Sequence, residues 1–140
     1  MTTIVRTIHF SAGHRLWQHE HKCAHIHGHN YLVEFHATAE HLDSLGRVID
    51  FSAMKDRLGG WIEEHWDHGF ICNKDDHEVI EAMKRVPGQK LFVMDANPTA
   101  ENLALYLLRI VGPQQLAGTG VKLVRVVLQE TENCRAEVTE

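Results

Sequence analysis

Alternating apolar and polar residues predict strands near both ends of the chain. Residues 30–38 alternate cleanly between two faces, which is typical of a half-buried strand. Residues 3–10 show a similar alternation that Ser11-Ala12-Gly13 interrupts. Residues 121–130 are almost continuously apolar, and residues 133–139 follow at the distance of a hairpin partner. The pattern therefore predicts two strands at each end.

Apolar residues at helical spacing predict three helices between the two pairs of strands. These helices run from Ser52, as N-cap, to about His65, over Asp75 to Val86, and from Thr99, as N-cap, to Gly112-Pro113. Gly59-Gly60 inside the first helix costs about 1 kcal/mol per glycine, unless these positions admit a close neighbour. Grouped helices between runs of strands predict an α+β fold, an antiparallel sheet with helices on one face.

Length and charge narrow the class of protein. The 140 residues contain no linker or repeat, so we expect one domain over residues 1–140. A net charge of -5 argues against a nucleic-acid surface, which needs a basic patch. No apolar run is long enough to span a bilayer, and the N-terminus lacks a signal pattern, so the cytoplasm is expected. Three widely spaced cysteines predict no disulfide framework.

Histidine is the residue type that changes this picture, because the chain contains 12 of them. In His27-Gly28-His29, two imidazoles two residues apart point the same way on an extended segment. If the first two strands pair as a hairpin, His14 lies beside them. Three histidines with an open fourth position predict a catalytic zinc site, although imidazole also suits copper, nickel and iron. The alternative is a solvated, non-specifically metal-binding tract.

Four other side chains are candidates for chemistry. Cys23 lies four residues before His27 and could act as a base or nucleophile near a metal, or close the site as a structural fourth ligand. Asp67-His68 has the composition of a carboxylate that orients an imidazole, but the pair alone also fits a solvated loop. Glu130 ends an apolar stripe, where a carboxylate either caps the sheet edge or binds two N–H donors of a ligand.

These residues occur within motifs that follow one another along nearly the whole chain. The motifs are Phe10-Ser-Ala-Gly-His-Arg-Leu16, Cys23-Ala-His-Ile-His-Gly-His-Asn-Tyr31, Ile49-Asp-Phe51, Trp66-Asp-His68, Asn97-Pro-Thr-Ala-Glu-Asn102 and Gln129-Glu-Thr131. In this order and spacing they resemble the 6-pyruvoyltetrahydropterin synthase / 6-carboxytetrahydropterin synthase family. Three residues between the cysteine and His27-Gly28-His29 resemble the queuosine-pathway form, 6-carboxy-5,6,7,8-tetrahydropterin synthase.

The resemblance implies a tunnelling fold (T-fold): a four-stranded antiparallel sheet with helices on one face. Subunits would form a homohexamer, a dimer of trimers, with active sites at subunit interfaces. The substrate would be 7,8-dihydroneopterin triphosphate, converted to 6-carboxytetrahydropterin with release of acetaldehyde and triphosphate.

The resemblance also implies a role for each candidate residue. His14, His27 and His29 would hold Zn²⁺. Cys23 would abstract a proton, and Asp67 with His68 would assist its transfer. For substrate binding, Glu130 would anchor the guanidine-like edge of the pterin, and Thr99 is a second candidate within its motif.

Two other functions stay open at this point. One is a pyruvoyl-forming synthase of the same family, and the other is a non-catalytic, histidine-rich zinc-binding protein. Residues 69–96 look longer than in compact members and predict an extra helix. A triphosphate needs cations, and Arg15 and Lys22 lie near the metal motif, although the net charge is acidic.

Overall fold

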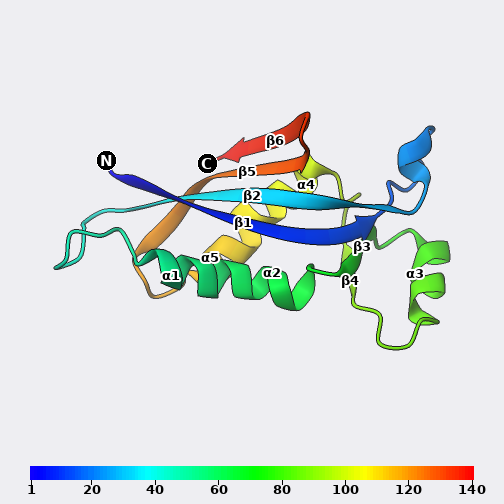
Figure 1. Ribbon diagram of the computed structural model, residues 1–140, viewed down its shortest axis with the longest axis horizontal. Coiled ribbons are helices and arrows are strands. Elements are labelled where there is room, and N and C mark those ends of the chain that lie inside the picture. Colours follow the sequence, from blue (N-terminus) through cyan, green and yellow to red (C-terminus); the bar gives the residue numbers. More distant parts are fainter.

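A curled six-stranded sheet forms the frame of the protein (Figure 1). The computed structural model describes residues 1–140. In sheet order the strands are β4 (Leu91–Met94), β3 (Gly69–Asn73), β1 (Thr3–His14), β2 (His27–Ala39), β5 (Val121–Thr131) and β6 (Cys134–Thr139). The α+β class is confirmed.

The four predicted strands are present and pair antiparallel in the order β1, β2, β5, β6. The number of strands was wrong, because β3 and β4 add two short parallel pairings beside β1. All five residues of β3 are buried, so this strand has no polar alternation by which the sequence could reveal it. Strand β1 also continues through Ser11-Ala12-Gly13, where the sequence pattern had predicted a break.

The first predicted helix is continuous from α1 (Phe51–Met54) through a π turn, η2 (Lys55–Gly59), to α2 (Gly60–His65). Its N-cap is Asp50 and not Ser52, since the Asp50 carboxylate accepts the Ser52 N–H at 2.7 Å. A Cβ at Gly59 would lie 3.0 Å from Ile8 Cδ1, so this glycine lets the helix approach β1 closely.

The last helix begins as predicted, with the Thr99 hydroxyl accepting the Asn102 N–H. It runs through α4 (Ala100–Tyr106) and a π turn, η3 (Leu107–Val111), into α5 (Gly112–Gln115). The predicted stop at Gly112-Pro113 was therefore wrong. Pro113 lies in the first turn of α5, where a missing N–H is tolerated.

The segment 69–96 contains β3, β4 and the helix α3 (His77–Lys84), which confirms the extra helix predicted there. The Asp76 carboxylate caps α3 by accepting the Val79 N–H. A short 3-10 helix, η1 (Lys22–Ala24), lies in the connection between β1 and β2.

Helices α1, α2, α4 and α5 cover one face of the long strands, while α3 lies beyond the sheet at the β3–β4 end (Figure 1). The main core of 24 buried residues lies between that face and the helices, and includes Phe35 and Val126 from the sheet and Leu58 and Leu107 from the helices. None of the helices is long and apolar enough to cross a membrane. The connection holding η1 projects from the end of β1 and β2 opposite the N-terminus (Figure 1).

Candidate functional site

The three predicted metal ligands converge at this end of the β1–β2 pair. The register sets His14 opposite His27 and Ala12 opposite His29. Because opposite residues of an antiparallel pair share a face, all three imidazoles lie on the same side of the sheet. Their ligating nitrogens lie within 4.8 Å of one another. The predicted placement of His14 beside the other two is confirmed, and the group could hold a metal ion.

The hydrogen bonds of two rings determine which nitrogens are free. His14 Nδ1 lies 2.8 Å from the Pro98 carbonyl oxygen, and His27 Nδ1 lies 2.7 Å from that of His25. Carbonyl oxygens only accept, so in the neutral rings both protons are on Nδ1 and both Nε2 atoms carry lone pairs. These two Nε2 atoms are 3.1 Å apart. Two facing lone pairs at this distance repel unless they share a cation, so the local geometry favours a cation site.

Burial favours the metal-binding form of two of the rings, His14 and His29. His14 is only 2% exposed, and its burial lowers its pKa to about 4 despite the opposing Pro98 hydrogen bond. Burial also lowers the pKa of His29, against the attraction of the nearby Glu130 carboxylate. Neutral imidazole is the form that ligates metals, so the lowered pKa values of His14 and His29 favour metal binding by these two rings near neutral pH.

Glu130 borders the three histidines from β5. Its Oε1 lies 3.6 Å from His14 Nε2 and 3.7 Å from His29 Nε2. The carboxylate is partly exposed, so it can contact both the metal side of the site and a ligand that enters from solvent. The structure thus brings Glu130 to the histidines, and its binding of a ligand stays a prediction.

Asp67 and His68 form a turn beside β1 in the connection from α2 to β3. Asp67 Oδ1 accepts the Ser11 N–H at 2.9 Å, and Asp67 Oδ2 lies 3.0 Å from His68 Nδ1. Partial burial raises the pKa of Asp67, but the Ser11 and His68 contacts outweigh it, so the pKa is lowered overall. His68 has a left-handed φ of 59° and its side chain is 83% exposed. The two side chains are therefore in contact, with the imidazole facing solvent, and their role in proton transfer stays a prediction.

Cys23 lies on η1 and is half-buried. Its carbonyl accepts the Leu16 N–H at 2.8 Å, while its thiol has no hydrogen bond to the histidines. The structure thus brings together the histidines and Glu130, whereas Cys23 and the Asp67–His68 pair lie in separate segments around them. Cys72 is buried in a small second core, and burial raises its pKa to about 11.

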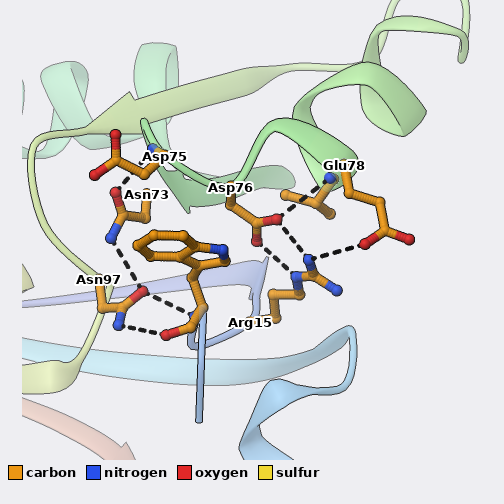
Figure 2. Close-up of polar contacts among 8 residues, drawn as sticks. Arg15, Asn73, Asp75, Asp76, Glu78 and Asn97 are labelled. Carbon is orange, nitrogen blue, oxygen red and sulfur yellow. Dashed lines mark hydrogen bonds and ion pairs between the residues drawn. The ribbon is translucent and has the colours of Figure 1, made fainter.

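Two further candidates are engaged in structural contacts. The Arg15 guanidinium makes a two-pronged ion pair with the buried Asp76, with Nε 2.6 Å from Oδ2, and also approaches Glu78 (Figure 2). Its charge is therefore neutralised within the chain, which disfavours Arg15 as a triphosphate ligand. The Thr99 hydroxyl caps α4, two residues after Asn97.

An open cleft joins several of these groups on the β1–β3 side of the sheet. Its volume is about 500 Å³, and its lining includes Ser11, His29 and His68. Met83 and Gln89, from the long segment 69–96, also line it. Neither this role nor that of the Pro98 carbonyl has a sequence signature, because both depend on segments that meet only in the folded chain.

The family model described as 6-pyruvoyl tetrahydropterin synthase matches residues 3–140. The chain belongs to this family. A 6-carboxy-5,6,7,8-tetrahydropterin synthase of Rickettsia felis is 41% identical over 138 residues, covering 99% of this chain and all of that protein. A protein of the same name from Aquifex aeolicus is 33% identical, covering 98% of this chain and 97% of its own. The resemblance inferred from the motifs is confirmed.

Solved structures show the same fold. An uncharacterized protein from Wolinella succinogenes superposes with a TM-score of 0.81 at 26% identity, covering 99% of this chain and 98% of its own. The 6-pyruvoyl tetrahydropterin synthase of Caenorhabditis elegans superposes with a TM-score of 0.69 at 22% identity, covering 99% and 95%, which shows a common fold. The T-fold expectation is confirmed, with two more strands than predicted.

Proposed function

We propose that this family member is a zinc-dependent 6-carboxy-5,6,7,8-tetrahydropterin synthase. It converts 7,8-dihydroneopterin triphosphate to 6-carboxytetrahydropterin, releasing acetaldehyde and triphosphate, as a step of queuosine biosynthesis. Relatives that bear this name and match almost the full length of the chain support the reaction. The three residues between Cys23 and His27 support the carboxy-forming branch over the pyruvoyl-forming one.

The main evidence for the metal centre is the pair of facing Nε2 atoms on His14 and His27, which lie 3.1 Å apart. The Nδ1 atoms of both rings donate to backbone carbonyl oxygens. With His29 they form three nitrogen donors and leave a fourth position open, which is the donor set of catalytic zinc sites. When bound, zinc supplies Lewis-acid polarisation of a substrate oxygen.

Residues of the chain itself then handle the proton. We assign Cys23 as the base that removes a proton from carbon, and Asp67 with His68 as the pair that carries protons to and from solvent. The exposed imidazole of His68, held by the Asp67 carboxylate at 3.0 Å, supports the second assignment.

Substrate binding is assigned to Glu130, with Thr99 as a second contact. A carboxylate can accept two parallel N–H bonds from the guanidine-like edge of a pterin, and Glu130 lies where such a ring can reach both it and the histidines. Thr99 stands in the turn whose Pro98 carbonyl orients His14, so a ligand contact there would lie close to the same site.

The active form would be a homohexamer, a dimer of trimers, in which each active site lies between subunits. Membership of the 6-pyruvoyl tetrahydropterin synthase family supports this assembly. The three cysteines form no disulfide, which supports a cytoplasmic location. We take residues 1–140 as one pterin-synthase-like domain.

Product identification tests the reaction directly. Zinc-loaded protein is incubated with 7,8-dihydroneopterin triphosphate, and the products are identified by mass. We expect 6-carboxytetrahydropterin together with acetaldehyde. The mass of 6-pyruvoyltetrahydropterin would instead assign the chain to the pyruvoyl-forming branch of the family. If authentic substrate is not converted, the alternative function, a non-catalytic zinc-binding protein, is favoured.

Metal analysis tests the centre independently of turnover. We expect about one zinc per chain after purification, as a three-ligand catalytic site predicts. Chelation should abolish product formation, and zinc should restore it. Zinc content that stays unchanged in a His27→Ala variant would contradict the assigned ligands.

A further inference from the structure

Residues 15–26 join β1 to β2 and carry Cys23; we call them the Cys23 loop. Its first three residues are each held by a different partner. The Arg15 guanidinium pairs with Asp76, the Leu16 N–H donates to the Cys23 carbonyl at 2.8 Å, and the backbone of Trp17 is bound by Asn97. The position of Cys23 is therefore tied to Leu16, which lies between two anchored residues.

Asn97 binds the backbone of Trp17 in both directions. The Trp17 N–H donates to Asn97 Oδ1 at 2.9 Å, and Asn97 Nδ2 donates to the Trp17 carbonyl at 3.0 Å. The side-chain amide of Asn97 thus satisfies both backbone groups of Trp17, as a paired strand would do within a sheet. Of side chains of this length only asparagine offers both a donor and an acceptor, because aspartate presents oxygens alone.

Asn97 is itself held by residues of α4 and β3. Its carbonyl accepts the Asn102 Nδ2–H at 2.9 Å, and Asn102 belongs to α4. Its Oδ1 also lies 3.4 Å from Asn73 Nδ2, at the end of β3. The next residue, Pro98, holds the His14 ring. Asn97 therefore connects the Cys23 loop to the helix that packs on β5, a region far from the loop in sequence.

We propose that Asn97 is a positioning residue that fixes Cys23 relative to the histidine site, acting through Trp17 and Leu16. The proposal rests on the proposed function for the role of Cys23. A reacting group on a loop gains its working geometry from supports on rigid elements, and a misplacement of about 1 Å can cost about 100-fold in rate.

The test combines amide hydrogen exchange with kinetics on the zinc-loaded protein, using Asn97→Ala and Asn97→Asp. Both variants lose the donor to the Trp17 carbonyl. We expect the Leu16 amide, which bonds to Cys23 and not to Asn97, to exchange at least about 10-fold faster. We expect kcat to fall about 10- to 100-fold, while KM and zinc content stay near the wild-type values.

Thr119→Ala is the matched control, because Thr119 Oγ1 also makes two backbone hydrogen bonds, to the Leu116 carbonyl at 2.6 Å and from the Val121 N–H at 3.1 Å. It lies at the opposite end of the sheet, since Val121 pairs with Ala39. The Thr119→Ala variant should show the same Leu16 amide exchange rate and the same kcat as the wild type. Asn97→Ser replaces Asn97→Ala should the latter not fold.

Unchanged Leu16 exchange in folded Asn97 variants would overturn the proposal. So would a loss of zinc that accounts for the loss of turnover, because Asn97 would then act on His14 through Pro98. Hydrogen exchange is measured without substrate. It therefore tests the link between Asn97 and the Leu16 amide independently of the reaction that the wild-type protein catalyses. A wild-type protein without product would instead refute the proposed function.

Discussion

The buried, neutral state of His14 predicts a steep acid sensitivity of the metal-free protein. In the folded chain the His14 pKa is about 4, against 6.5 when the ring is solvated. The unfolded chain therefore binds a proton more readily between these values, and folding stability falls as the pH drops below about 6.5. From pH 7 this one ring costs about 2 kcal/mol at pH 5 and about 3 kcal/mol at pH 4. Typical domains are stable by only about 5–15 kcal/mol, so the effect is measurable.

The assay is urea unfolding of metal-free wild type and a His14→Gln variant at pH 7, 6, 5 and 4. The variant will differ in stability at every pH, so the comparison is between slopes. The wild type should lose about 3 kcal/mol more than the variant between pH 7 and pH 4. Chelator is present throughout, because bound zinc would hold the ring deprotonated. Parallel curves for the two proteins would refute the buried, neutral His14.

Three substitutions test other parts of the structure. Cys23→Ala should keep the zinc and lower kcat by about 100-fold or more, as loss of a base does; a drop in zinc affinity would instead make Cys23 a structural ligand. Glu130→Gln should raise KM by about 10-fold or more with zinc content intact, whereas loss of zinc would place its main role at the metal. Gly112→Ala should destabilise by about 1–3 kcal/mol in urea unfolding, because its Cβ would lie 2.6 Å from Leu123 Cδ1. Gly60→Ala, which meets nothing within 4 Å, is the control and should not destabilise.

The strands that alternate and the helix that begins with a strong cap were predictable because their signals are local. The alternation over residues 30–38 identified β2, and the Thr99 hydroxyl caps α4 as expected. Strand β3 was missed for the opposite reason. Its five buried residues are covered on both faces, so the strand is defined by its neighbours β1 and β4 and not by its own pattern.

The candidate site likewise has features that the sequence predicts and contacts that it does not. The spacing of His27 and His29 placed both rings on one face, since strand geometry alone determines it. The charge of Arg15 looked available from the sequence, yet Asp76, which comes 61 residues later, neutralises it. A pairing over that distance depends on where α3 packs, which no local pattern contains.

By itself, then, the sequence determined the family, the α+β class and the three histidines that meet, because strand periodicity and motif spacing are properties of short segments. Only the tertiary structure decided that Glu130 faces those histidines, that the Pro98 carbonyl orients His14, and that Asn97 holds the loop of Cys23. Each of these contacts joins residues far apart in the chain. Their geometry follows from the pairing of β5 with β2 and the packing of α4 on β5, and packing is a property of the whole fold.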